Sequence, residues 1–189
     1  MASASGATPP VQAKGEEDGM TMRVPAAARG RYRMLRIGVV VAALVVVLDQ
    51  LAKWFARDAL WNPPRAIEVT SFFNLVPVEN RGISFGLLES DSGFGPWLIA
   101  GIAVVISLAL MIWLARTRRV WPALALGLIV GGALGNVIDR ARLGWVIDFI
   151  DIHAAGYHWP AFNIADAGIT VGVAILLIDG LFRPSRPAK

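Results

Sequence analysis

The chain has 189 residues, of which 56% are hydrophobic and only 17% are Asp, Glu, Lys or Arg. Soluble domains carry about a quarter charged residues, so length and composition predict a single domain that resides in a membrane. The absence of cysteine excludes disulfides, thiolate metal ligands and a cysteine nucleophile. The only histidines, His153 and His158, lie close together, so a metal site would have few ligands to draw on.

Residues 1–33 are rich in Ala, Gly, Pro and charged residues and show no apolar period, so we expect a disordered tail. The first apolar run, Ile37–Leu48, follows a basic flank, as the core of a cleaved signal peptide would. The run continues through Asp49 to Phe55 without a small-residue cleavage site, which favours a retained helix.

Four apolar segments are each long enough to cross a membrane. They cover approximately residues 34–55, 97–115, 120–138 and 164–182. At about 1.5 Å per residue, about 20 residues cross a hydrocarbon core roughly 30 Å thick. The sequence therefore predicts an all-α integral membrane protein, with a transmembrane domain over residues 34–182 and a short tail at 183–189.

The basic residues predict the orientation of these helices. With four crossings, the N-terminal tail, the link after the second helix and the C-terminal tail share one side. Their basic residues are Lys14, Arg23, Arg29, Arg31, Arg33, Arg36, Arg116, Arg118, Arg119, Arg183, Arg186 and Lys189. Short loops rich in Lys and Arg stay in the cytoplasm, so both termini are expected inside. This distribution accounts for the formal net charge of +4 without a nucleic-acid partner.

Two long loops, 56–96 and 139–163, then lie outside. Residues 66–76 are β-branched and aromatic, which favours a small sheet on the outer membrane face. Glu89–Gly93 has the composition of a turn. In the third helix a glycine recurs every four residues, at Gly127, Gly131 and Gly135, which is typical of close helix packing.

Carboxylates and amides gather at the outer end of this topology. They are Asp49, Gln50, Asn136, Asp139, Asp148, Asp151, Asn163 and Asp166, with Lys53 and Arg140 among them. Ionisable groups at membrane depth are costly unless paired or solvated, so they are candidates for function. Asp179, at the inner end of the fourth helix, is assigned no role.

Several of these residues also have a purely structural interpretation. Asn163 and Asp166 fit the first turn of the fourth helix as a capping box. Asp49 and Lys53 are spaced as an i,i+4 ion pair.

The end of the third helix suggests a further structural pair. Asp139 and Arg140 are adjacent in a position where the helix dipole disfavours an anion. We expect an Asp139–Arg140 ion pair, with Asn136 bonded to nearby backbone.

Asp148 is harder to explain as structure. It lies within the apolar stretch 146–150 without a basic neighbour, so desolvation should raise its pKa. The N-terminal end of a helix should instead favour the charged form of Asp166. Two acids in such different environments can act as an acid/base pair. If they share a water, one activates it while the other protonates a leaving amide nitrogen, as in aspartic proteases.

Over roughly residues 35–182 the chain resembles the lipoprotein signal peptidases, also called signal peptidase II. Five blocks in order carry the resemblance: Asp49-Gln50-x-x-Lys53, Asn80-Arg81-Gly82-Ile83-Ser84-Phe85-Gly86, Gly131-Gly132-x-x-Gly135-Asn136-x-x-Asp139-Arg140, Val146-Ile147-Asp148-Phe149 and Phe162-Asn163-x-Ala165-Asp166. Ser84 departs from the family pattern, which often has alanine there.

The resemblance implies an enzyme of the bacterial cytoplasmic (inner) membrane, and we expect it to be a monomer. Its fold would be four transmembrane helices with a small extracytoplasmic β-cradle and a short helix over the site. It would cut diacylglyceryl-modified prolipoproteins just before the lipidated cysteine, without metal or cofactor, and be inhibited by globomycin. The catalytic pair would be Asp148 and Asp166. The supporting positions would be Asp49, Asn80, Gly82, Asn136, Asp139, Arg140, Asn163 and Ala165.

Two other classes of function fit some of these features. Intramembrane carboxylates also mark ion pathways in transporters and channels, although such a pathway should continue across the bilayer. A non-enzymatic scaffold would use the aspartates only as caps and ion pairs. Cleavage of a lipid-modified prolipoprotein separates both classes from a peptidase.

Overall fold

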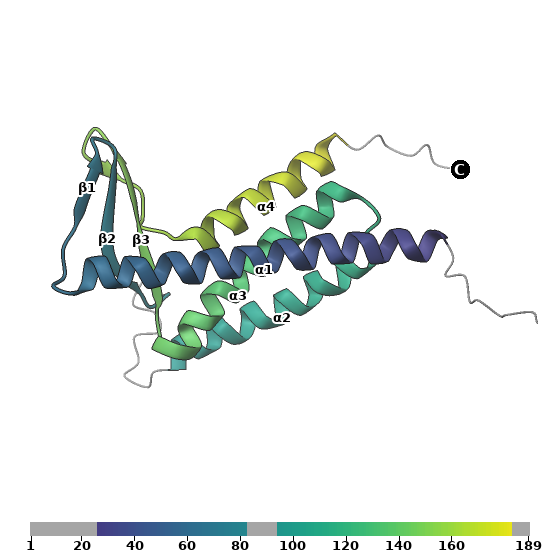
Figure 1. Cartoon of the computed structure of the whole chain (residues 1–189), viewed down its shortest axis with the longest axis horizontal. Helices are drawn as coiled ribbons and strands as arrows, with labels where there is room; N and C mark the ends of the chain where they lie inside the picture. Colours follow the sequence, from purple (N-terminus) through teal and green to yellow (C-terminus); the bar gives the residue numbers. More distant parts are fainter. Residues whose placement is uncertain (1–25, 83–93, 183–189) are drawn as a thin grey trace, which may run out of the picture.

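The computed structural model describes residues 26–82 and 94–182. The turn expected at Glu89–Gly93, Ser84 and most of both tails lie outside these ranges. Four helices dominate the described part and run side by side (Figure 1): α1 (Ala26–Trp61), α2 (Phe94–Arg116), α3 (Val120–Leu143) and α4 (Ile164–Leu181). All four are long and apolar enough to cross a membrane, which confirms the predicted helical membrane fold.

The helices extend beyond the apolar runs that predicted them. Helix α1 begins at Ala26 and ends at Trp61, whereas the apolar run indicated residues 34–55. Helix α3 continues to Leu143 and ends at Gly144, whose φ of 81° is in the left-handed region that favours glycine. Hydropathy marks only the part of a helix suited to hydrocarbon, while backbone hydrogen bonding continues into the polar turns beyond it.

Helix α3 is the centre of the bundle and packs against each of the other three helices. Its glycines allow backbones to approach closely. A Cβ atom at Gly127 would lie 2.5 Å from the carbonyl oxygen of Gly38, and one at Gly131 would lie 2.6 Å from that of Ala42. Both contacts are with α1, so the predicted small-residue face of α3 is confirmed.

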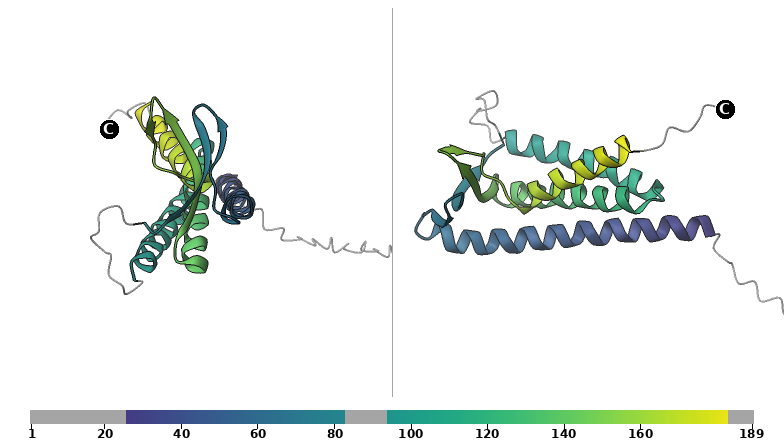
Figure 2. Two further views of the ribbon diagram at one scale, coloured as in Figure 1. Left: turned by 90° about the vertical axis from the view of Figure 1, so that its left-hand side faces the viewer. Right: turned by 90° about the horizontal axis from the view of Figure 1, so that it is seen from above.

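An antiparallel sheet lies at one end of the bundle (Figures 1 and 2). Its strands, in spatial order, are β1 (Ile67–Thr70), β2 (Phe73–Asn80), β3 (Val146–Ala154) and β4 (Tyr157–His158). The first two confirm the sheet expected near residues 66–76. The strands β3 and β4 were not predicted, because residues 146–149 of β3 are buried in succession and lack the polar alternation of an exposed strand.

Strand β3 is fixed against the end of α1. Ile147 and Phe149 are buried in an apolar cluster with Ala56 and Leu60 of α1. Successive side chains of a strand point to opposite faces, so Asp148 points away from this cluster. In this way the packing of two apolar neighbours aims a carboxyl group toward α3 and α4.

Candidate active site

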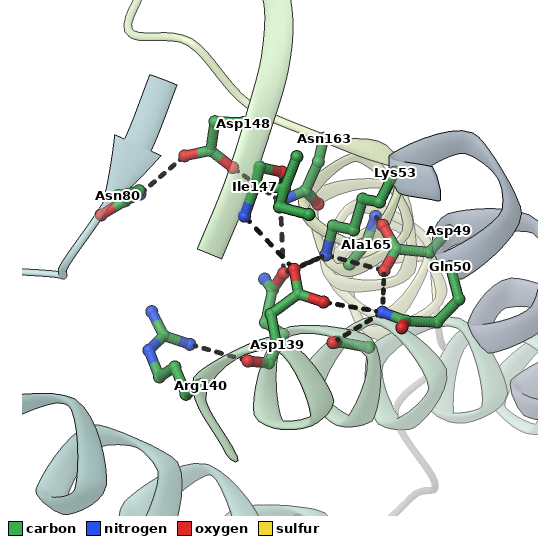
Figure 3. Close-up of polar contacts among 12 residues, drawn as sticks. Asp49, Gln50, Lys53, Asn80, Asp139, Arg140, Ile147, Asp148, Asn163 and Ala165 are labelled. Atoms are coloured by element: carbon green, nitrogen blue, oxygen red, sulfur yellow. Dashed lines mark hydrogen bonds and ion pairs between the residues drawn. The ribbon is translucent and has the colours of Figure 1, made fainter. Parts of the chain in front are cut away.

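The predicted cluster of polar residues forms where the ends of α1, α3 and α4 meet β2 and β3 (Figure 3). It is almost closed to solvent around Lys53 and Asp148, whose exposed fractions are both 1%. Asp166 and Arg140 are half-buried, and Asn80 is exposed at the rim. Every residue that the sequence assigned to the site therefore comes from one of these five elements or from the turns beside them.

Lys53 joins α1 to α3 at the base of the cluster. Its Nζ lies 2.8 Å from Asp49 Oδ2 and 2.7 Å from Asp139 Oδ2, so the predicted Asp49–Lys53 pair is confirmed. The predicted Asp139–Arg140 pair is wrong. Consecutive residues of an α-helix point about 100° apart. Asp139 therefore faces Lys53, while Arg140 turns aside and donates to the carbonyl oxygen of Asn136 at 3.5 Å.

The two buried carboxylates bonded to Lys53 also hold main chain. Asp139 Oδ2 accepts from the Ile147 N–H at 3.3 Å, and Asp49 Oδ1 accepts from the Ala165 N–H at 2.9 Å. Gln50 Nε2 donates to Asp139 Oδ1 at 2.8 Å and so adds a second link from α1 to α3. Ile147 precedes Asp148 and Ala165 precedes Asp166. Asp49 and Asp139 thus position the segments that carry the two candidate acids.

The capping box predicted for α4 is confirmed. The Asp166 N–H donates to Asn163 Oδ1 at 3.0 Å, and the Asn163 N–H donates to Asp166 Oδ2 at 3.2 Å. This contact places the Asp166 carboxyl group beside the N-terminal end of α4, where the helix dipole favours an anion.

Asparagine side chains surround the two candidate acids. Asp148 Oδ2 accepts from Asn80 Nδ2 at 2.8 Å, and Asp148 Oδ1 accepts from Asn163 Nδ2 at 2.6 Å. Asp166 Oδ1 accepts from Asn136 Nδ2 at 2.7 Å. Asp166 Oδ2 accepts from the Asn163 N–H, as described above. Each of the four carboxyl oxygens of Asp148 and Asp166 therefore accepts one hydrogen bond from an N–H group. The expectation that Asn136 would bond to backbone is corrected here, since its side chain joins other side chains.

The orientation of these three amides, Asn80, Asn136 and Asn163, follows from their other partners. The carbonyl oxygen of Asn80 accepts from the Gly82 N–H at 2.8 Å, and that of Asn163 accepts from the Asp166 N–H. The carbonyl oxygen of Asn136 accepts from Lys53 Nζ at 3.0 Å. Backbone N–H and ammonium groups donate but cannot accept, so each amide must turn its NH₂ group toward an acid.

The environment of Asp148 raises its pKa to about 6, which is the direction that the sequence predicted. Burial is the largest cause, because it disfavours the charged carboxylate. The hydrogen bond from Asn80 opposes this change, while the nearby negative charge of Asp166 adds to it. A carboxyl group with this pKa can carry a proton in a site where its neighbour is ionised.

Other polar residues lie apart from this cluster. Asp151 accepts from Asn74 Nδ2 at 2.9 Å and contacts His158 Nδ1 at 2.9 Å within the sheet. Asp179 pairs with Arg119 at 2.6 Å at the opposite end of the bundle. Across residues 26–82 and 94–182, no group of three His, Cys, Asp or Glu side chains is arranged to hold a metal ion.

The sequence placed Lys53 in the polar cluster but gave it no role beyond its pair with Asp49. The structure adds its contacts with Asp139 and Asn136. The i,i+4 spacing with Asp49 explains only one of three bonds, and no local pattern indicates the other two.

Comparisons with known proteins identify the family of this chain. A family model for signal peptidase (SPase) II matches residues 41–182. A lipoprotein signal peptidase of Methylobacterium sp. (strain 4-46) is 43% identical over 155 residues, covering 82% of this chain and 94% of that protein. One of Paraburkholderia phytofirmans is 46% identical over 144 residues, covering 76% and 83%.

A solved structure shows the same fold. A bacterial membrane enzyme determined by the in meso method at 1.9 Å matches with a TM-score of 0.69 and 31% identity, covering 78% of this chain and 94% of that one. Together with the family match and the curated relatives, this similarity shows that the chain belongs to the signal peptidase II family.

Proposed function

We propose that Asp148 and Asp166 are the catalytic pair of a membrane aspartic endopeptidase that removes signal peptides from diacylglyceryl-modified prolipoproteins. The cut falls just before the lipidated cysteine. Family membership supports the activity and the prolipoprotein substrate. The observation that supports the assignment of the pair is the set of four N–H donors on the two carboxyl groups.

The two acids differ in a way that suits hydrolysis of an amide. Asp166, held by two N–H donors at a helix N-terminus, is the ionised member and takes a proton from the attacking water. The water oxygen bonds to the scissile carbonyl carbon and forms a tetrahedral intermediate. Asp148, whose burial raises its pKa to about 6, is the protonated member. It gives its proton to the leaving amide nitrogen as the carbon–nitrogen bond breaks.

An apolar groove supports a lipid-linked substrate. It has a volume of about 460 Å³ and is lined by residues of α1, α2 and α3, including Val46, Val104 and Leu134. Val46 and Leu134 lie within one helical turn of Asp49 and Asn136. An acyl chain or an apolar signal helix can occupy such a groove while the scissile bond reaches the acids.

The proposal places the acid pair at the extracytoplasmic face of a bacterial inner membrane, with both termini in the cytoplasm. The basic residues of the tails and of the link between α2 and α3 support this orientation. A monomer is sufficient, because one chain supplies both acids. Globomycin-type inhibitors should compete with the prolipoprotein for the same site.

The sequences of α2 and α3 do not support the alternative function as a transporter. A proton or ion pathway needs polar groups across the bilayer. Helix α2 carries no charged residue from Phe94 to Ala115, and α3 carries none from Val120 to Ile138. The acids of the proposed site lie together at one end of the helices.

The test is cleavage of a diacylglyceryl-modified prolipoprotein by purified protein. Asp148→Asn and Asp166→Asn should each lower kcat by about 10²–10⁴-fold, the usual contribution of a general acid or base. Asp179→Asn is the matched control, since its Arg119 pair lies at the other end of the bundle. A folded Asp148→Asn or Asp166→Asn variant that cleaves at the wild-type rate would refute the pair. Ion conduction without cleavage by the wild type would favour a transporter.

A further inference from the structure

We infer that Lys53 is a positioning residue of the peptidase, because its ammonium group holds the Asn136 amide in the orientation that donates to Asp166. This inference rests on the proposed function, in which Asp166 is the ionised acid. It adds a residue on α1 to a site whose two acids come from β3 and α4.

Lys53 has a complete set of partners. An ammonium group has three N–H donors. Those of Lys53 meet Asp49 Oδ2 at 2.8 Å, Asp139 Oδ2 at 2.7 Å and Asn136 Oδ1 at 3.0 Å. The side chain is 2% exposed, so water does not replace any of these contacts. With all three donors in use, Lys53 donates no hydrogen bond to either acid and reaches Asp166 through Asn136, while its positive charge also lowers the pKa of Asp148.

The orientation of the Asn136 amide depends on side chains, and mainly on Lys53, whereas main-chain groups orient the other two amides. Asn80 and Asn163 are oriented by the main-chain N–H groups of Gly82 and Asp166. The carbonyl oxygen of Asn136 is bonded only by side chains, Lys53 at 3.0 Å and Asn163 Nδ2 at 3.2 Å. Asn163 Nδ2 makes its shortest contact elsewhere, with Asp148 Oδ1 at 2.6 Å.

Loss of the ammonium group therefore permits a half-turn of the Asn136 amide. Asp166 Oδ1 would then face a carbonyl oxygen in place of the NH₂ group at 2.7 Å. Two facing oxygens repel unless a proton lies between them, so this orientation favours a protonated Asp166. A protonated Asp166 cannot accept the proton of the attacking water.

Charge around the acids acts in the same direction. The charged groups of the cluster that contains Asp166 are Lys53 and Asp49 of α1, Asp139 and Arg140 of α3, and Asp148 of β3. Lys53, Asp49 and Asp139 together carry a formal charge of −1. Removing Lys53 alone leaves −2 in a buried cluster, which also threatens folding. A test must separate this charge from the orientation of the amide.

The variant Lys53→Met/Asp139→Asn meets this need. It retains the formal charge of −1 through Asp49 but lacks the ammonium group. Asp139→Asn alone is the matched control, because Lys53 and its bond to Asn136 remain. The measurement is kcat/KM for a diacylglyceryl-modified prolipoprotein as a function of pH, in protein shown to be folded.

We expect the acid limb of this profile to move to higher pH by about one unit in Lys53→Met/Asp139→Asn, because loss of a hydrogen bond to the charged form disfavours that form. The limb of Asp139→Asn should not move upward. Asn136→Leu should reproduce the upward shift, and adding it to the Lys53 variant should move the limb no further, since both changes remove one interaction. A purely structural lysine would lower the rate at every pH and leave the limb in place, which would overturn the inference.

A second measurement does not depend on cleavage. Infrared difference spectra of Asp148→Asn and Asp148→Asn/Asp166→Asn isolate the carboxyl band of Asp166. When Lys53→Met/Asp139→Asn is combined with Asp148→Asn, we expect the Asp166 band to show protonation at higher pH than in Asp148→Asn alone. Unchanged titration of this band would refute the role of Lys53. If the wild type fails to cleave at any pH, the proposed function falls, and the infrared titration still decides the role of Lys53.

Discussion

Asn80 is the residue through which the pKa of Asp148 can be changed most directly. Burial raises this pKa to about 6, and the Asn80 hydrogen bond limits the rise. Asp148 acts in its protonated form, so activity should be lost as pH rises through its pKa. Removing a donor that stabilises the carboxylate should therefore move this loss to higher pH.

We predict that Asn80→Ala moves the descending limb of the kcat/KM profile upward while lowering the maximum. Asn74→Ala is the control, since Asn74 also lies on β2 but donates to Asp151. A descending limb that stays in place or moves downward in Asn80→Ala would show that Asp148 is not the group protonated in the active enzyme.

Residues differ in how far the sequence predicted their surroundings. Asp148 could be predicted because its apolar neighbours are adjacent in the chain. The capping box of Asn163 and Asp166 could also be predicted, because the two residues are only three positions apart in the chain. Asn136 could not be predicted, because its partners Lys53 and Asp166 lie 83 and 30 residues away. The prediction for Asp139 was wrong because it relied on adjacency in the sequence. Consecutive residues of a helix point in different directions, so Asp139 pairs with Lys53 on α1 and not with Arg140.

At the scale of elements, contact between α3 and α4 sets the position of Asp166. A Cβ atom at Gly132 would collide with the carbonyl oxygen of Ala165 and lie 2.8 Å from Ile169 Cγ1. The carbonyl oxygen belongs to the first turn of α4 and cannot move without the main chain. Any side chain at Gly132 must therefore displace the turn that holds Asp166.

We predict that Gly132→Ala lowers kcat by about 10²-fold, the usual cost of misplacing a catalytic group by about 1 Å. The control is Gly101→Ala in α2, where a Cβ atom meets nothing within 4 Å. Alanine is favoured over glycine in a helix by about 1 kcal/mol, so the control should be at least as stable as the wild type. Equal activity of the two variants, each in its folded form, would contradict this account of α4.

Apolar runs predicted the existence of all four helices, since a span of about 20 apolar residues has few other structures. They did not predict the ends, which depend on caps such as Gly144. Strand β3 was missed for a related reason. Its first half is buried on both faces, against α1 on one side and within the polar cluster at Asp148 on the other, so its sequence shows no alternation. Burial of both faces depends on the elements packed against the strand, so it cannot be predicted from the sequence of the strand alone.

At the scale of the whole molecule, the orientation in the membrane remains a prediction from charge. We expect reporters fused after Arg119 and after Lys189 to be cytoplasmic. A reporter fused after Gly156, in the turn between β3 and β4, should be extracytoplasmic. A cytoplasmic signal at Gly156 would reverse the orientation and place the acids on the wrong side for an exported prolipoprotein.

The fixed amides have a consequence for resistance to inhibitors. Gly82 and Asp166 orient Asn80 and Asn163 through main-chain N–H groups, which no change of side chain elsewhere in the chain removes. A compound that binds these asparagines thus meets groups that a remote mutation cannot reorient, and mutation of the asparagines themselves removes a donor from an acid. Escape from such a compound should therefore arise in the apolar groove of Val46, Val104 and Leu134, where substitutions alter fit without touching the chemistry.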